Sequence, residues 1–303
     1  MSKETTNEKG KEEKRVEKKQ TSHVFWLHNR GLLLILIASF SLLLFFSCLL
    51  FVKGEGSGGE ALLRGCAVLL SLAMPSFFYL RSAGNEHAFV FGKLPPLRAL
   101  PRVLLFGLGA FALGLLFGTL GTKDGGLFSV FAYPTAFSVS SLASLLAYAF
   151  GTAFLPFGLL ASHLSESGRL GILLPVASLY AAFAFSLTGS ALMLLFGLLL
   201  SLLYLAYRSF FSVLGVNAAF LLGGYVGVLL PDTGASPLVL SILLAALAAA
   251  LLFGSLDYAA LRRAVRELPS GKDTKKWVLW ALFGVLALVS SLLLSLFVLE
   301  NIG

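Results

Sequence analysis

A group of polar side chains inside long apolar stretches is the first place in this sequence where chemistry could occur. Its members are Ser144, Tyr148, Thr152, Ser178, Tyr180, Ser186 and Asn217. Hydroxyl and amide groups do not act as a general base unless another group helps them. In an apolar setting they must find hydrogen-bond partners. We therefore expect either structural hydrogen bonds between helices or the lining of a cavity, the latter at Thr152, Tyr180, Ser186 and Asn217.

A second group contains residue types that are more reactive. His163, Glu166 and Arg169 are spaced three residues apart, so they share one face if the segment is helical. A histidine and a glutamate supply only two metal ligands, and a catalytic zinc site needs three from the protein. The group therefore predicts a solvated surface cluster with an ion pair, and the sequence implies no metal and no other cofactor.

The chain that carries these residues is far more apolar than a soluble domain. Of its 303 residues, 57% are hydrophobic and only 13% are charged, and the mean hydropathy is +0.89. Several stretches run for eighteen or more residues without a charge, which is the length needed to cross a bilayer as a helix. The fold class predicted is all-α, a polytopic bundle of membrane-spanning helices.

Nine stretches meet this description. The predicted spans are 31–52, 61–80, 103–121, 137–161, 171–187, 190–207, 210–230, 238–256 and 277–299. Arg64 is the only charged residue within them, and it lies in a first turn from which its side chain can reach the interface. The absence of other charges argues against an ion-coupled transporter, which usually needs carboxylates or histidines inside the membrane.

The chain divides into an amino-terminal tail and a membrane domain. Residues 1–30 are rich in Lys and Glu and hold few apolar residues, so we expect a disordered tail. Phe25 and Trp26 stand where an interfacial aromatic anchor would lie. Residues 31–303 form the predicted transmembrane domain. A signal peptide is not expected, because the charged lead and the apolar run are both too long.

The distribution of positive charge predicts the orientation. With the tail in the cytoplasm, 20 Lys and Arg residues fall on the cytoplasmic side, and only Lys53, Arg64 and Lys123 fall on the other. The amino terminus is therefore predicted to be cytoplasmic and the carboxy terminus to lie on the opposite side of the plasma membrane. The net charge of +8 is explained by these loops, and membrane lipid rather than nucleic acid is the expected partner.

Two further patterns concern packing. Gly114 and Gly118 are four residues apart, as are Gly223 and Gly227, and small residues at this spacing let helix backbones approach closely. We interpret both pairs as helix contacts within the molecule, with dimer faces as the alternative. Residues 256–268 place leucine and valine on one face and arginines on the other, which predicts a short amphipathic helix at the cytoplasmic surface.

Residues 88–230 resemble the core of the CPBP family of intramembrane proteases, the CAAX-protease-like group. The lead into the family's core is similar to FVFGKLPPLRALPRVLLFGLGAFALGLLFG, and the helix bearing Glu-Glu-x-x-x-Arg is similar to AFLPFGLLASHL. The Phe-x-x-x-His helix is similar to SLYAAFAFSL, and the last pair, ending in His-x-x-x-Asn, to FGLLLSLLYLAYRSFFSVLGVNAAFL. The resemblance implies an intramembrane bundle in which glutamates and histidines activate a water molecule.

The catalytic residues of that family do not carry over to this sequence. In the first motif the paired glutamates fall on Thr152 and Ala153 and the arginine on Phe157. In the second motif the phenylalanine is kept as Phe183, but the histidine falls on Leu187. In the third motif the histidine falls on Asn217 and the asparagine on Leu221. We therefore interpret the chain as a pseudoprotease that binds a transmembrane peptide or another membrane protein. The alternatives are an active protease with divergent motifs and a component of a permease or transporter.

Overall fold

The structure is a computed structural model, and it describes the backbone of five long stretches of the chain. These are residues 94–120, 139–161, 173–182, 187–229 and 237–267, together with single residues and short stretches at 37, 39–41, 43–44, 66, 69–74, 282, 284–286, 289 and 293. The chain divides into two compact units, Met1–Phe40 and Ser41–Gly303. In the first, the described residues Ile37, Ser39 and Phe40 are helical, and every element discussed below belongs to the second.

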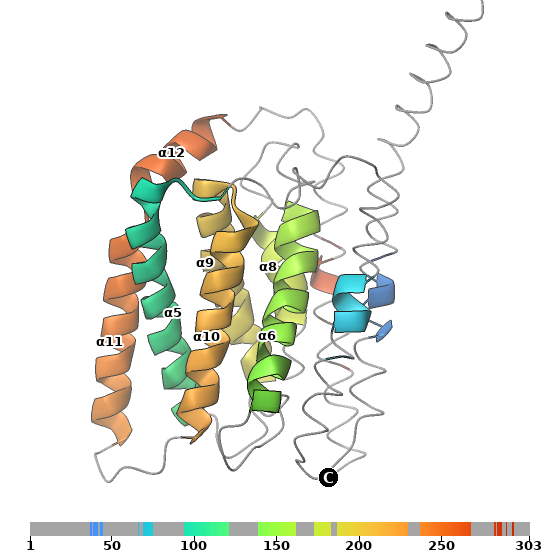
Figure 1. The fold of residues 1–303 in the computed structure, drawn as a ribbon, viewed down its shortest axis with the longest axis horizontal. Coiled ribbons are helices and arrows are strands. Elements are labelled where there is room, and N and C mark those ends of the chain that lie inside the picture. The colour runs from blue at the N-terminus through green and yellow to red at the C-terminus, as the bar shows by residue number, and fades with distance from the viewer. Residues whose placement is uncertain are drawn as a thin grey trace, which may run out of the picture. The chain divides into compact units, whose positions relative to one another are not determined.

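All the described elements are helices, which confirms the predicted fold class for this part of the chain. In order they are η1 (Leu69–Ala73), η2 (Leu97–Ala99), α5 (Leu100–Leu120), α6 (Val139–Ala153), η4 (Phe154–Leu160), α8 (Leu173–Ala181), α9 (Leu187–Tyr207), α10 (Phe210–Leu229), α11 (Pro237–Ser255) and α12 (Tyr258–Glu267). The helices α5, α6, α9, α10 and α11 run as long rods, α8 is shorter, and α12 lies across the ends of the bundle (Figure 1).

Three helical stretches are long and apolar enough to cross a membrane. They are Leu97–Thr119, Leu142–Leu160 and Phe210–Leu229, and Ala191–Tyr207 and Leu240–Ser255 are shorter apolar helices. These five stretches fall on predicted spans. The predicted spans at 31–52, 61–80 and 277–299 lie largely outside the described residues, so the total of nine stays a prediction.

Two predicted boundaries need correction. Helix α5 begins at Leu100 and not at 103, because Arg102 lies in the first turn, from which its guanidinium reaches Asp257. Leu187, predicted to end the span at 171–187, instead begins α9. In both cases the sequence shows an apolar stretch clearly but does not show which residue starts the helix.

Helices α9 and α10 are joined by only two residues and run as an antiparallel pair. Arg208 has φ of 49°, and its backbone N–H donates to the Tyr204 carbonyl oxygen at 2.7 Å. This is the left-handed conformation that ends many helices, and it reverses the chain at once. The Ser209 hydroxyl oxygen then accepts a hydrogen bond from the Ser212 N–H at 3.4 Å and caps the start of α10.

Helices α5 and α10 form the most extensive helix pair in the described part of the chain. Gly114 and Gly118 of α5 face Gly223, Gly224 and Gly227 of α10, with backbone against backbone. A Cβ atom on Gly227 would lie 2.5 Å from the Leu115 carbonyl oxygen and 3.0 Å from the Gly118 Cα. The prediction that both glycine pairs make internal helix contacts is confirmed, and the two pairs contact each other. We call this contact the glycine seam.

Helix α12 is held at the end of the bundle by Asp257. One carboxylate oxygen of Asp257 accepts from the Ala260 N–H at 2.9 Å, so Asp257 caps the helix. The other carboxylate oxygen pairs with Arg102 of α5. Helix α12 also packs against α9. The predicted amphipathic helix is therefore present, and it starts one residue after its cap.

Candidate functional site

A buried hydrogen-bond network joins α6, α8 and α10, and Asn217 is at its centre. The Tyr180 hydroxyl donates to Asn217 Oδ1 at 2.5 Å. Asn217 Nδ2 donates to the Ala149 carbonyl oxygen at 2.9 Å and to Thr152 Oγ1 at 3.2 Å. Asn217, Thr152 and Tyr180 are each 0% exposed, so the protein itself supplies the partners of these groups.

Thr152 completes the network because its hydroxyl both donates and accepts. It donates to the Tyr148 carbonyl oxygen at 2.8 Å, one turn back in α6, and its oxygen accepts from Asn217. Asn217 thereby uses both N–H groups and its carbonyl oxygen. Polar groups that are fully satisfied in this way are stable in an apolar interior, whereas a single missing partner leaves a costly unpaired group.

A proline shapes the helix beside this network. Pro156 has no N–H, so the Thr152 carbonyl cannot receive the usual bond from the residue four positions later. The helix responds by widening to a π-helix, η4, and the Ala161 N–H donates to the Pro156 carbonyl oxygen five residues back. The predicted span at 137–161 is helical from Val139 to Ala161, and its stretch Phe154–Leu160 is a π-helix, which the sequence pattern did not predict. Proline inside an apolar stretch was the available signal.

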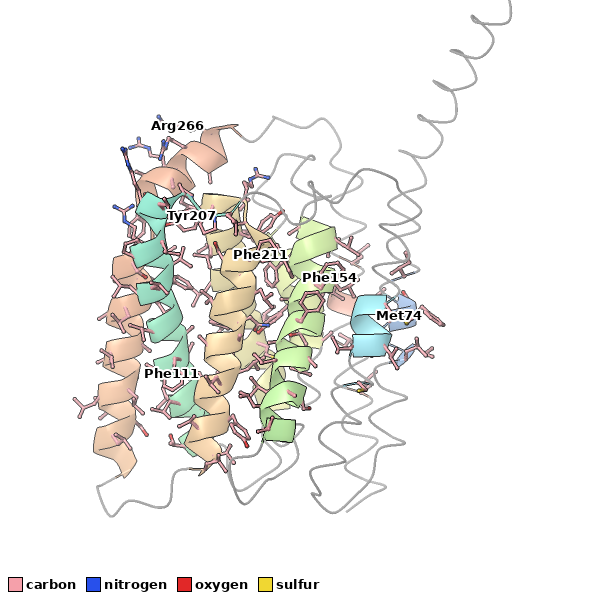
Figure 2. The ribbon with its side chains drawn as sticks, viewed as in Figure 1. Met74, Phe111, Phe154, Tyr207, Phe211 and Arg266 are labelled. Carbon is pink, nitrogen blue, oxygen red and sulfur yellow. The ribbon has the colours of Figure 1, made fainter. Side chains whose placement is uncertain are left out.

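Aromatic rings enclose the network. The Tyr180 ring contacts Phe157 edge-on with centroids 5.7 Å apart, and its centroid lies 6.4 Å from that of Phe196. Phe196 stacks on Phe220 at 4.1 Å. Phe154, labelled in Figure 2, belongs to a second ring cluster with Phe210, centroids 5.6 Å apart. Phe157 and Phe196 therefore pack against the ring of Tyr180, whose hydroxyl bonds to Asn217.

The structure brings three of the four predicted cavity residues together. Asn217 bonds to both Thr152 and Tyr180, and the expectation of structural hydrogen bonds between helices is confirmed for Asn217. Their lining of a cavity stays a prediction. Ser144 and Ser178 are buried as well. The fourth cavity residue, Ser186, and the cluster of His163, Glu166 and Arg169 lie outside the described residues.

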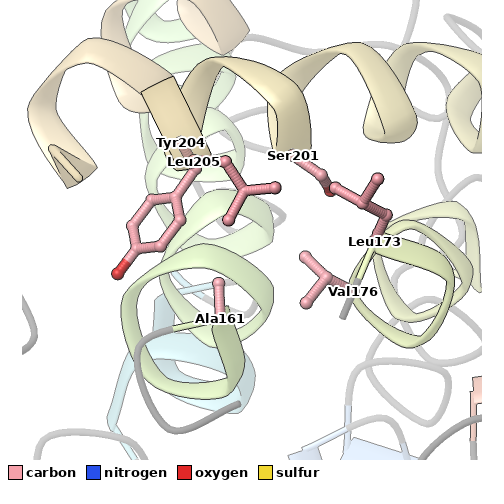
Figure 3. A pocket seen from close by; sticks show the side chains of 6 residues that line it. All are labelled: Ala161, Leu173, Val176, Ser201, Tyr204 and Leu205. Carbon is pink, nitrogen blue, oxygen red and sulfur yellow. The ribbon is translucent and has the colours of Figure 1, made fainter. Parts of the chain in front are cut away.

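A small crevice lies between η4, α8 and α9. Its walls are Ala161, Leu173, Val176, Ser201, Tyr204 and Leu205 (Figure 3). It is too narrow to admit a water molecule. The Ser201 hydroxyl donates to the Gly197 carbonyl oxygen within its own helix at 2.7 Å. The crevice therefore offers neither the room nor the polar groups that a small ligand would need.

The chemistry open to the network is binding and positioning. Its side chains are two kinds of neutral group, hydroxyl and amide, and neither takes up a proton near neutral pH. Within the described residues, no three His, Cys, Asp or Glu side chains gather where a metal ion could be held. The network can orient helices and can present hydrogen-bonding groups, but it cannot by itself activate water.

Comparisons with known proteins give no match to this chain. The sequence matches no protein-family model, and it matches neither a curated protein nor a solved structure.

Proposed function

We propose that this chain is a multi-pass membrane protein with a CPBP-like core that has lost its catalytic groups and acts by binding. Its partner would be a transmembrane peptide or another membrane protein. The proposal has two parts, a family-like arrangement of helices and a site without catalytic capacity. Each part rests on the same pair of residues, Thr152 and Asn217.

The contact between Thr152 and Asn217 carries the proposal. The resemblance aligns Thr152 with the first of the family's paired glutamates and Asn217 with its last histidine. Residues in these roles must lie close together on neighbouring helices, although they are 65 positions apart in the sequence. The distance of 3.2 Å between Asn217 Nδ2 and Thr152 Oγ1 agrees with that requirement.

The residue types at these positions favour binding over catalysis. Removal of one general base usually lowers a rate by about 10²–10⁴-fold, and here the glutamate and histidine positions are changed together. Thr152 and Asn217 also bond to each other, so the polar groups that would hold a water molecule are already occupied by protein. We expect no cofactor to be needed.

The membrane placement that goes with the proposal has nine spans, a cytoplasmic amino terminus and a carboxy terminus outside the plasma membrane. The described arginines support the orientation. All six lie at the end of the bundle where α5 and α10 begin and α9 and α11 end, namely Arg98, Arg102, Arg208, Arg262, Arg263 and Arg266. Clustering of positive charge at one end is typical of the cytoplasmic side.

Photocrosslinking in native membranes tests the binding function. A photoreactive residue at Leu146 would probe the outer face of α6, which carries Thr152 on its inner face. The matched control is the same probe at Leu243 on α11, which is similarly exposed, 62% against 51% for Leu146. We expect a specific protein adduct at Leu146 and much less at Leu243. Equal labelling at both positions, or lipid adducts alone, would contradict the proposal.

Turnover assays test the absence of catalysis. The full chain in lipid nanodiscs is incubated with prenylated and transmembrane peptides, and we expect no cleavage that scales with its concentration. The variant Glu166→Gln is the control, because His163 and Glu166 are the remaining acid–base pair predicted near the core. Cleavage by the wild type that disappears in this variant would establish an active protease.

A further inference from the structure

Helix α12 presents its charged face outward at the end of the bundle. Leu261 and Val265 are half-buried, whereas Arg262, Arg263 and Arg266 are exposed. Arg266 lies in the last turn of α12, and its side chain points away from the helices below (Figure 2). Helix α12 packs against α9, and the burial of Leu261 and Val265 shows that its apolar face is the more covered one.

The orientation of this helix is fixed by contacts of Asp257, and among the arginines of α12 Arg263 donates from Nε to the Ala259 carbonyl oxygen at 3.4 Å within the helix. Asp257 caps α12 through the Ala260 N–H at 2.9 Å and through its own carbonyl oxygen, which accepts from the Leu261 N–H at 2.8 Å. The second carboxylate oxygen of Asp257 pairs with Arg102 at the start of α5. The charge of Arg102 is thus neutralised by Asp257, and Asp257 is already paired with Arg102.

Arg98 extends the charged face of α12 onto the start of α5. It lies in η2, one turn before Arg102, and it is exposed. The Arg102–Asp257 pair brings this turn and α12 to the same end of the bundle. We define the basic surface as Arg98, Arg262, Arg263 and Arg266.

The position of the basic surface along the helix axes indicates which ligand it binds. Directly below it, α5 and α11 expose large apolar side chains, among them Leu104 at 60% and Phe253 at 54%. In a membrane these side chains face lipid tails, so the headgroups of the same lipids lie at the level of the arginines. Guanidinium groups match phosphate geometry well because they can donate two parallel hydrogen bonds.

We propose that the basic surface binds the phosphate headgroups of anionic phospholipids in the surrounding leaflet. The site would select anionic over zwitterionic lipids and would hold this end of the bundle at the interface. This inference depends on membrane insertion but not on the proposed pseudoprotease function, so it can fail or succeed independently of the peptide-binding test.

Lipid retention on the full chain tests the inference. The protein is purified in detergent containing equal amounts of phosphatidylglycerol and phosphatidylcholine, and bound lipids are counted by native mass spectrometry. Each arginine near an anionic surface contributes about a fivefold preference. We therefore expect the wild type to favour phosphatidylglycerol at least about tenfold. The triple variant R262Q/R263Q/R266Q keeps only Arg98 of this surface, so its preference should fall to about fivefold.

Two control variants separate charge from other effects. The variant R262K/R263K/R266K keeps the charge and should keep most of the preference. The variant K53Q/R64Q/K123Q removes three positive charges that are predicted to lie on the opposite side, and it should retain the full preference. An unchanged preference in R262Q/R263Q/R266Q would overturn the proposal. So would equal stabilisation of the wild type by millimolar inorganic phosphate, because the site would then be one for a soluble anion.

Discussion

Helix α10 contacts its neighbours in two opposite ways. Towards α5 it presents Gly223, Gly224 and Gly227, and the two backbones touch. Towards α6 and α8 it presents Asn217, towards α9 it stacks Phe220 on Phe196, and large side chains fill the space. The separation of six residues places Gly223 about 120° around the helix axis from Asn217. Helix α10 therefore packs within the membrane in two ways, by direct backbone contact on one side and through large side chains on the other.

The difference follows from what stabilises contacts between helices in lipid. Removing apolar surface from lipid gains little, because lipid tails are as apolar as leucine, so close packing and hydrogen bonds must provide the stability. The glycine seam relies on close packing, and the Asn217 network relies on hydrogen bonds. Adding an atom at the glycine seam should therefore lower the free energy of unfolding. Removing a donor or acceptor from the Asn217 network should lower it as well.

The largest expected effect comes from adding one methyl group to the seam. In Gly223→Ala the new Cβ would collide with the Phe111 carbonyl oxygen of α5. Backbone cannot move aside as a flexible side chain can, so α5 and α10 must separate. We expect a loss of about 3 kcal/mol in the free energy of unfolding, near the top of the range for overpacked sites. Thermal unfolding in detergent measures it.

Gly215 provides the matched control on the same helix. A Cβ at this position meets nothing within 4 Å. Gly215→Ala should therefore be neutral, or stabilise by about 0.5–1 kcal/mol through the higher helix propensity of alanine. Similar losses in both variants would mean that α10 does not pack against α5 as described.

The next largest effect comes from removing the amide of the network. Asn217→Leu keeps the side-chain size but deletes three hydrogen bonds and leaves the Tyr180 hydroxyl without its acceptor. Buried groups that lose their partners cost about 1–3 kcal/mol each, and hydrogen bonds between membrane helices are often weaker. We expect a loss of about 2 kcal/mol. Unchanged stability with altered crosslinking at Leu146 would indicate a binding role for the amide instead.

Several of these features could be predicted from the sequence because their physical signals are local. The spacing of Gly114, Gly118, Gly223 and Gly227 predicted close contacts. The cost of an unpaired amide in lipid predicted that Asn217 faces the interior. The partners could not be predicted. Nothing in the spacing says that the two glycine pairs contact each other, or that Tyr180 and the Ala149 carbonyl bond to Asn217, because these contacts depend on how distant helices are arranged.

The π-helix at η4 shows a different limit. Its cause, Pro156, is visible in the sequence, but a proline can kink, break or widen a helix. Which of these occurs depends on the surrounding packing, and here every residue from Phe154 to Leu160 is buried. The sequence therefore marks the position of the irregularity but not its form.

A smaller effect should follow from removing a single hydrogen bond from the network. Tyr180→Phe keeps the ring contacts with Phe157 and Phe196 and deletes only the bond from the hydroxyl to Asn217 Oδ1. We expect a loss of about 1 kcal/mol, less than for Asn217→Leu. In the double variant the two losses should not add, because the two residues share this bond. Strict additivity would show that the bond does not contribute.

The smallest effect separates the buried network from the polar contact at the surface. The pKa of Asp257 is lowered, first by the hydrogen bond from the Ala260 N–H and also by Arg102. A group whose pKa is lower in the folded protein stabilises it above the ordinary value of 3.8 and loses this contribution as the pH falls through the folded pKa. Because the contact is solvent-exposed, we expect Asp257→Asn to cost only about 0.5 kcal/mol at pH 7. This deficit should vanish in strong acid, where wild-type Asp257 is protonated.

The deficit of Asn217→Leu should persist at every pH, because the amide and hydroxyl groups of the Asn217 network do not titrate in this range. Parallel unfolding measurements from strong acid to pH 8 compare the two. A deficit for Asn217→Leu that disappears in acid would mean that a titrating group supports the network.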